Sequence, residues 1–361
     1  MRCLRSSRPI RRLTSVASGV LLGLTAVQAA DDNPTSVFDS IQQSVQAVFE
    51  KSRGAVVKIQ GVDRHGQLAG TGFFIDPFGT IFTCYSVGGE TQNLTVTVGN
   101  QRFPAHRLVS DLRSGVAILK INPDTLTADT QFLPFGNSRQ LGVAAPVIAV
   151  GFPMDLPLTP AFGTVGGFDH QFQGHLFATA HIRANIPVQR GEGGAPLLNS
   201  KGEVVGILMS RVDAGNASFV LPIEAAEKIR KDYVRFHEVR PGWIGVQVKS
   251  TETPVAGSKA QITEVIPNGP AEKAGLKDGD VVLRVGEIGV TCLEDMIDAS
   301  FFLSPEGEVI VRVARDGSER DFPVMPVDHP DFGRPHLPPP ILDPALEPTV
   351  SPVTPFLKIA P

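Results

Sequence analysis

The 361-residue sequence contains little cysteine, tryptophan or tyrosine, with three, one and two of these residues respectively. Cys3 lies in the N-terminal stretch, and Cys84 and Cys292 are far apart along the chain. Disulfide-stapled folds need dense cysteine pairs, and zinc sites need closely spaced cysteine and histidine. The sequence therefore excludes a disulfide scaffold, predicts neither a metal nor a cofactor, and leaves Cys84 as a small buried residue.

A long hydrophobic run is also missing. Five arginines precede a short apolar run over residues 16–27, which ends in small residues. This order is typical of an export signal, and the run is shorter than the roughly 20 residues of a spanning helix. We expect cleavage after residue 30, no stable membrane span afterwards, and a periplasmic or extracellular protein; an uncleaved membrane anchor is the alternative.

The chain has no excess of basic residues. Removal of residues 1–30 takes away five arginines and no acids, and changes the formal charge from −4 to −9. An acidic exported protein is a poor candidate for binding nucleic acid, because phosphate binding needs a basic surface.

Long helical patterns are scarce as well. Between residues 55 and 220, apolar strands of four to eight residues alternate with Gly, Pro, Asn and Asp, without the alternation of strands and helices that parallel sheets require. Helical spacing occurs at 37–51 and 223–236. A second strand-rich unit runs from 243 to 327, with helix-like pieces at 270–275 and 293–302, and the final 36 residues hold 11 of the 30 prolines.

These patterns predict five segments. They are an export signal (1–30), an N-terminal segment with a short amphipathic helix (31–54), a β-rich domain (55–236), a second small domain (240–327) and a proline-rich disordered tail (328–361).

A glycine-rich turn reads RGEGGAPLLN over residues 190–199 and leads into an apolar strand. Its tip carries no hydroxyl, thiol or imidazole, although such turns often present a nucleophile.

The order of segments resembles the HtrA family. The stretches GTGFFIDPFGTIFT, SDLRSGVAILK, PVIAVGFP and GEGGAPLLNSKGEVVGI resemble framework segments of the family, and AEKAGLKDGDVVL resembles its PDZ motif. The resemblance covers residues 37–327 and implies a mainly β protein, with a trypsin-like double β-barrel followed by a PDZ domain.

The three positions that match the catalytic triad of this family carry other residues. Ser86 occupies the histidine position, Gly115 the aspartate position and Gly193 the serine position. Acyl transfer to serine needs a base and an orienting carboxylate, and none of the three supplies either. Ser86 or Cys84 as a displaced nucleophile would need an unseen base. Six histidines fall outside the matching motif: His65, His106, His170, His175, His181 and His237.

The turn of Gly191, Glu192 and Gly193 resembles an oxyanion hole, since its backbone N–H groups can form an anion-binding nest. The alternative is that the glycines only make a tight turn.

The second domain carries the positive functional signal. Resemblance to the PDZ domains of the family implies a carboxylate-binding loop at Trp243, Ile244, Gly245 and Val246. Val246, Gln247 and Val248 would offer a strand edge for an extended peptide, while Ile244, Val246 and Met296 would line an apolar pocket for its last side chain, with a preference for small or aliphatic C-termini. The alternative is that Ile244 and Val246 are ordinary core residues.

Two classes of function remain open. The first is an exported, catalytically inactive protein that binds extended peptides or protein C-termini as a scaffold, chaperone-like holder or regulator of an active relative. The second is an atypical serine endopeptidase of protein quality control. The resemblance also implies a homo-oligomer, specifically a trimer.

Overall fold

The computed structural model describes residues 34–126, 130–211 and 217–330, so the expected export signal and most of the expected tail lie outside the described residues. Within these ranges no helix is both long and apolar enough to cross a membrane.

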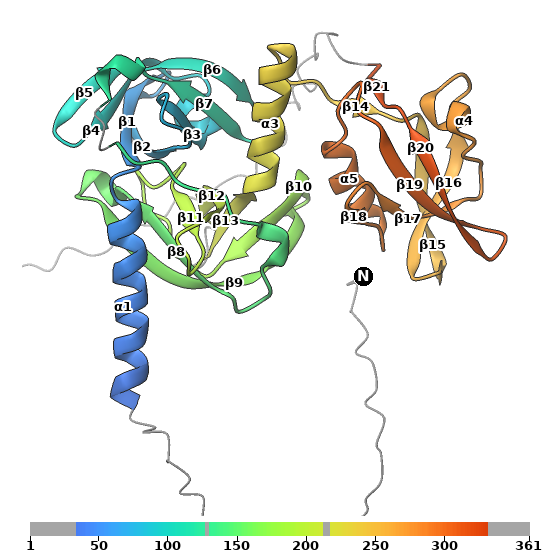
Figure 1. Ribbon diagram of the computed structural model, residues 1–361, viewed down its shortest axis with the longest axis horizontal. Coiled ribbons are helices and arrows are strands. Elements are labelled where there is room, and N and C mark those ends of the chain that lie inside the picture. Colours follow the sequence, from blue (N-terminus) through green and yellow to red (C-terminus); the bar gives the residue numbers. More distant parts are fainter. Residues whose placement is uncertain (1–33, 127–129, 212–216, 331–361) are drawn as a thin grey trace, which may run out of the picture.

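The first element is helix α1 (Pro34–Ser52), which contains the helix expected over 37–51. Its C-terminal half packs on the β-rich domain, where Val48 is buried and Val45 and Phe49 contact the core. Its N-terminal half projects away from that domain (Figure 1), and leaves Val37 and Phe38 58% and 71% exposed.

The β-rich part, called the barrel domain below, begins with a seven-stranded antiparallel sheet ordered β5-β4-β1-β2-β3-β7-β6. Its elements are β1 (Val56–Asp63), β2 (Gly66–Phe74), β3 (Thr80–Cys84), the one-turn helix α2 (Tyr85–Gly88), β4 (Gln92–Val98), β5 (Gln101–Pro104), β6 (His106–Asp111) and β7 (Val116–Lys120).

Six further strands form a closed barrel ordered β10-β13-β12-β11-β8-β9. They are β8 (Pro146–Gly151), β9 (Thr159–Phe172), β10 (His175–Ala184), β11 (Pro196–Leu198), β12 (Val204–Arg211) and β13 (Ser218–Pro222). Short 3-10 turns lie at Pro123–Thr125, Ser138–Gln140 and Pro153–Asp155.

One apolar core joins the two halves of the barrel domain. Phe73 and Phe82 of the first sheet belong to the same buried cluster as Ile148 and Val150 of the closed barrel. Burial of this surface is the main stabilising contribution, and it fixes the facing edges of the two halves, where the triad-like positions lie.

Helix α3 (Ile223–Phe236) connects the barrel domain to the C-terminal unit. It buries Ala225 and Ile229 in the core and ends at His237, whose left-handed backbone lets its N–H donate to Tyr233 O. The helix has the bounds that its 3.6-residue spacing predicts.

The C-terminal domain contains β14 (Gly242–Trp243), β15 (Val246–Val255), β16 (Ser258–Val265), α4 (Pro270–Ala274), β17 (Val281–Val285), β18 (Ile288–Gly289), α5 (Leu293–Phe301), β19 (Val309–Arg315), β20 (Ser318–Val324) and β21 (Val327–Asp328). The sheet is ordered β15-β16-β17-β19-β20, so β15 is an edge strand. The architecture confirms the mainly β fold with two β-rich units in the expected order.

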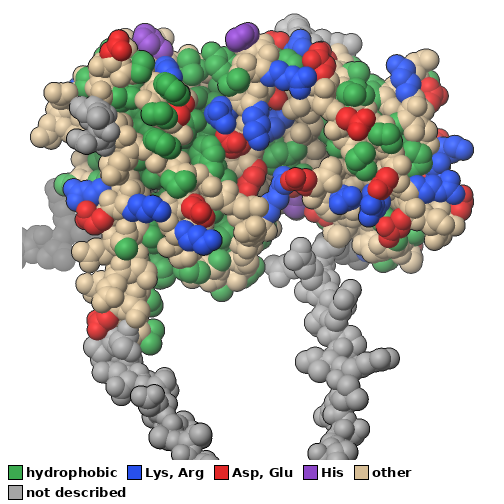
Figure 2. Space-filling view, viewed as in Figure 1, with side chains coloured by type: hydrophobic (Ala, Val, Ile, Leu, Met, Phe, Trp, Pro, Cys, Tyr) green, Lys and Arg blue, Asp and Glu red, His purple; other side chains and the backbone are tan. Residues whose placement is uncertain are grey.

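The surface carries both signs of charge. Figure 2 shows Lys and Arg side chains interspersed with Asp and Glu over both domains on the face that it presents.

Candidate functional site

Ser86, at the position expected for the base, lies on α2 directly after strand β3. Cys84 ends β3 and is fully buried, whereas Ser86 is exposed. The Tyr85 N–H donates to Gly115 O at 2.5 Å, so the start of α2 is bonded to the turn that holds the acid-like position. The structure therefore brings the segments of Ser86 and Gly115 together.

The glycine-rich turn is tied to β2 and β12. The Thr71 N–H donates to Gly193 O at 2.9 Å, and the Thr71 hydroxyl donates to Gly191 O at 2.6 Å. The Gly194 N–H donates to Leu208 O at 2.8 Å. Gly191 and Gly194 have φ values of 94° and 85°, which glycine adopts without the strain that a side chain would add. The turn thus has one defined conformation.

Gly193 faces the other predicted site residues. A Cβ atom on Gly193 would lie 3.3 Å from Cys84 Sγ and 3.9 Å from Ser86 Oγ. The first distance is tighter than an ordinary van der Waals contact and the second is ordinary, so a side chain at 193 would point toward Cys84 and α2. The positions expected for the nucleophile and the base are neighbours in space, although the residues present there cannot perform either role.

Other groups near this centre are unsuited to nucleophilic chemistry. Cys84 Sγ lies 3.1 Å from Ser86 Oγ, but burial raises the pKa of the Cys84 thiol and disfavours the reactive thiolate. Asp111 accepts a hydrogen bond from the Ser114 N–H at 2.9 Å and so closes its own turn. Of the six histidines, His181 is the buried one, and its Nδ1 lies 2.9 Å from Thr179 O in strand β10.

The oxyanion-like turn contains both free and occupied N–H groups. Within the described residues, the N–H groups of Gly191 and Gly193 are bonded to no protein acceptor, while the Glu192 N–H donates to Gln189 O at 3.2 Å. The Glu192 side chain is 5% exposed, accepts from the Gln189 N–H at 2.6 Å, and has a carboxyl pKa raised by burial. A buried carboxyl beside the turn opposes anion binding when it is ionised.

Met209 is the residue at this centre that the sequence did not reveal. Its methyl carbon lies 2.4 Å from the point where a Cβ on Gly115 would stand, and its side chain packs against the core shared by the two halves and against the core of the first sheet. An apolar group therefore fills the space next to the acid-like position. The only signal in the sequence was an apolar residue in a strand, which also fits ordinary core.

The second candidate site is the loop between β14 and β15. Ile244 O accepts from the Ala271 N–H at 2.8 Å, and Gly245 O accepts from the Ile266 N–H at 2.9 Å. Because C=O and N–H point in opposite directions in a trans peptide, the N–H groups of Gly245 and Val246 face away from these donors. The amide of Gly245, where φ is 81°, donates to no acceptor in the described chain.

The side chains of this loop and of the start of β15 differ in how deeply they are buried. Ile244 is 6% exposed and belongs to the core of the C-terminal domain, as the core interpretation predicts. Val246, Val248 and Met296 are partly buried and pack against the same core. Gln247 is exposed on the open edge of β15, and Trp243 is half-buried. Strand β15 and helix α5, which carries Met296, are in contact. The side chains of Val246, Val248 and Met296 on these two elements are called the candidate groove below.

Among the described residues, no group of His, Cys, Asp and Glu side chains has an arrangement that could hold a metal ion.

Comparison with protein families gives two matches. A trypsin-like peptidase domain matches residues 70–207, and a PDZ domain matches residues 242–325. The first covers the centre that includes Ser86, Gly115 and Gly193, and the second covers the groove and its loop.

Comparison with curated proteins finds bacterial proteases. The chain is 28% identical over 267 residues to a probable periplasmic serine endoprotease DegP-like from Chlamydia pneumoniae, covering 71% of this chain and 54% of that protein. It is 28% identical over 269 residues to the serine endoprotease DegS of Haemophilus influenzae, covering 72% and 77%. The chain thus spans about half the length of the DegP-like relatives that it matches.

The HtrA-type protease AlgW, solved with a tripeptide, has a similar fold, with a TM-score of 0.62 at 19% identity, covering 79% of this chain and 97% of that one. A serine endoprotease from Yersinia pestis gives a TM-score of 0.54 at 21% identity, covering 79% and 98%. The combination of the two domains, their order and these relatives lead to one conclusion. The chain contains a trypsin-like peptidase domain followed by a PDZ domain, and in this order of domains it is similar to the serine endoproteases of the HtrA family.

Proposed function

We propose that this protein is an exported, catalytically inactive member of the HtrA family that binds extended peptides or protein C-termini through its PDZ domain. The observation that carries the proposal is the position of Gly193, which faces Ser86 and Cys84 with no side chain of its own. Removal of a whole serine-protease triad lowers turnover by about 10⁶-fold, and the residual rate is too small for useful peptide hydrolysis.

The competing proposal is an atypical working endopeptidase. It is supported by the names of the relatives, which are serine endoproteases. It requires a base near Ser86 or Cys84, and the six histidines lie outside the matching motif. Burial of Cys84 and its raised thiol pKa argue further against this alternative.

Activity is tested with the purified mature protein, a fluorophosphonate probe and unfolded casein, beside an active DegP-like relative as positive control. We expect neither labelling nor cleavage. Labelling that disappears in Ser86→Ala or Cys84→Ala would support the endopeptidase and overturn the proposed inactivity.

Peptide capture is proposed at the loop that contains Gly245. The free Gly245 amide, the open edge of β15 and the partly buried Val246 and Val248 support it. A terminal carboxylate would accept from backbone N–H groups, and a small or aliphatic final side chain would contact Val246 and Met296. In this proposal Ile244 contributes its backbone, because its side chain is core.

The test compares labelled peptides that end in a free valine carboxylate with their amidated twins on the full mature chain. We expect the free acid to bind more tightly, and Gly245→Glu to abolish the difference. Gly257→Glu is the matched control, because Gly257 has a similar φ of 88° and open space around its Cβ position. Equal binding of acid and amide would reject carboxylate capture.

Self-association and export complete the proposal. Val37 and Phe38 on α1 are exposed, and Ile41 on the same helix lines a cavity of about 260 Å³ with Ile148 and Phe162. These apolar surfaces support the homo-oligomer that family resemblance implies, with an active relative as the other candidate partner. Light scattering of the mature protein and of the Phe38→Ser variant measures their molar masses. A monomer mass for both proteins would reject the homo-oligomer.

The proposed export is supported by the relatives that are named periplasmic.

A further inference from the structure

Helix α5 lies between the two domains. It contacts β15 of the C-terminal domain and β10 of the barrel domain. Figure 1 shows α5 on the side of the C-terminal domain that faces α3 and β10. One helix is therefore both a wall of the groove and the docking element of its domain.

The two roles use different faces of α5. Asp298 and Phe301 are three residues apart and lie on one side of the helix, whereas Met296 is two residues from Asp298 and lies on the other side. Met296 packs against the core of the C-terminal domain next to the groove. The contacts of α5 with the barrel domain thus lie on the face of the helix opposite Met296.

Asp298 holds α5 to strand β10. Its Oδ1 accepts a hydrogen bond from the Thr179 hydroxyl and one from the Ala180 N–H at 3.1 Å. Thr179 is 1% exposed, so this contact excludes water from one side. Hydrogen bonds to a charged acceptor are stronger than those between neutral groups.

Phe301 holds the other end of α5. It is 2% exposed and belongs to the apolar core cluster of the barrel domain, together with Ala225 and Ile229 of α3. The Arg113 guanidinium and the Lys228 ammonium lie 5.4 and 5.9 Å from its ring centre, within reach of cation–π attraction. Phe301, a residue of the C-terminal domain, is thus part of the core of the barrel domain.

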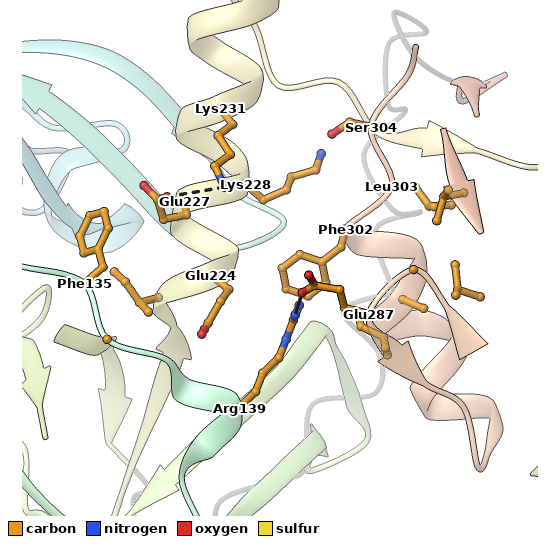
Figure 3. Close-up of a pocket in the computed structure, with 17 residues that line it drawn as sticks. Phe135, Arg139, Glu224, Glu227, Lys228, Lys231, Glu287, Phe302, Leu303 and Ser304 are labelled. Atoms are coloured by element: carbon orange, nitrogen blue, oxygen red, sulfur yellow. Dashed lines mark hydrogen bonds and ion pairs between the residues drawn. The ribbon is translucent and has the colours of Figure 1, made fainter. Parts of the chain in front are cut away.

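Elsewhere the two domains are less closely packed. A cavity of about 430 Å³ separates α3 from the C-terminal domain, and Phe302, Leu303 and Ser304 line its far side (Figure 3). Across its mouth Arg139 and Glu287 form an ion pair at 2.8 Å, and the Glu287 side chain is 87% exposed, so the pair contributes little. Asp298 and Phe301 therefore hold α5 itself, while the hydrogen bond from the Ser304 hydroxyl to the buried Asp232 at 2.9 Å holds the segment that follows the helix.

We propose that Asp298 and Phe301 are positioning residues of the peptide groove, because they hold α5 against the barrel domain and so keep the groove in its binding form. The proposal rests on the peptide capture proposed above. It implies that the barrel domain, although it lacks a triad, is needed for tight peptide binding. A groove whose wall is already ordered loses less conformational entropy when a peptide binds.

The experiment measures fluorescence anisotropy of the labelled free-acid peptide and its amidated twin with the full mature chain. We expect Asp298→Ala and Phe301→Ala to weaken binding of the free acid at least about fivefold, the lower end of usual coupling between sites. Asp298→Asn should recover most of the affinity, since its amide oxygen can accept the same two hydrogen bonds. Ser300→Ala is the matched control, because Ser300 is exposed on the same helix.

The outcomes separate the two proposals. If the wild-type chain does not distinguish acid from amide, peptide capture fails and this inference fails with it. If the wild-type chain does distinguish them and Asp298→Ala keeps wild-type affinity, only the positioning role is overturned. Hydrogen exchange provides a second readout: α5 amides should exchange faster in Asp298→Ala while β1 and β2 are unchanged, and unchanged protection of α5 would also overturn the inference.

Discussion

The side chain of Met209 occupies the space in front of Gly115, with its methyl carbon 2.4 Å from the point where a Cβ on Gly115 would stand. Gly115 itself has a φ of 80°, a conformation that strains residues with side chains. A carboxylate at this position would therefore need the end of the Met209 side chain to move, and it would sit on a backbone conformation that side chains rarely adopt. Apolar packing between the two halves of the barrel domain thus reaches the acid-like position.

The first prediction concerns the glycine-rich turn. Gly194→Ala should lower the free energy of unfolding by more than about 3 kcal/mol, because φ is 85° and the new Cβ would lie 2.2 Å from Thr71 O and from Thr83 Oγ1. Chemical denaturation of both proteins measures the difference.

Gly174→Ala is the matched control for that change. Gly174 has a similar φ of 81° in the β9–β10 hairpin, but nothing lies within 4 Å of its Cβ position. Its cost should be only the backbone strain of about 1–2 kcal/mol. If both variants lost the same stability, contacts within the turn would not explain the effect.

The second prediction concerns the buried ion pair of α3. The Lys228 ammonium lies 2.5 Å from Asp232, and the two side chains are 6% and 2% exposed. Lys228→Met should destabilise the protein by about 3–5 kcal/mol, because it leaves the Asp232 charge buried without its partner. Ser304 and the Arg240 N–H also donate to Asp232, and they would only partly compensate.

A second lysine of the same helix provides the control. Lys231 is paired with Glu227 at 3.7 Å, but its side chain is 71% exposed. Lys231→Met should therefore cost less than about 1 kcal/mol. The measurement is the midpoint of thermal unfolding of each variant relative to the wild type at one pH. Equal decreases in the midpoint would show that burial of Lys228 has no energetic consequence.

Much of the fold follows from the sequence, because strand-length apolar runs, turn residues and the 3.6-residue spacing of α3 are local signals. The residues at the triad-like positions also follow, since the framework motifs around Ser86, Gly115 and Gly193 place them. The structure brings two of these positions together, since a Cβ on Gly193 would lie 3.9 Å from Ser86 Oγ.

Contacts between distant segments could not be predicted in this way. The role of Met209 depends on a contact with Gly115, nearly one hundred positions earlier in the chain, and the docking of Phe301 depends on a core in another domain. In both cases the sequence shows an apolar residue in a regular element, and this pattern does not specify its neighbours. Ile244 illustrates the same limit. An isoleucine at this position fits a peptide-binding surface and a core position equally well, so the sequence does not distinguish the two.

The third prediction concerns pH. Burial raises the pKa of Glu192 above its ordinary value of 4.5, so the folded protein holds this proton more tightly than the unfolded chain. The resulting stabilisation is present below pH 4.5 and is lost as the pH rises through the folded pKa. Glu192→Gln should therefore be more stable than the wild type at pH 7, with a smaller difference at pH 4.

Denaturation midpoints at both pH values measure this effect. Glu264→Gln, at an exposed position of β16, serves as the control and should show no comparable dependence. A Glu192→Gln variant whose advantage is the same at pH 4 and pH 7 would contradict a role for ionisation.

The last prediction concerns reconstruction of a catalytic centre. The triple variant Gly193→Ser, Ser86→His, Gly115→Asp should remain unlabelled by a fluorophosphonate, because the Met209 methyl group occupies the space that the side chain at 115 would take. Addition of Met209→Ala opens that space, so the aspartate could reach the new histidine and orient it as a base. Aspartate also tolerates a positive φ better than most residues, which limits the strain at 115.

Labelling should therefore appear in the quadruple variant and disappear again when Ser86 is kept in place of histidine. Probe labelling is the appropriate readout, because it requires only an activated hydroxyl and not a complete turnover. The decisive comparison is between the triple and quadruple variants at matched folded fractions. Strong labelling of the triple variant would show that Met209 moves aside readily, and that loss of the triad residues alone accounts for the inactivity proposed here.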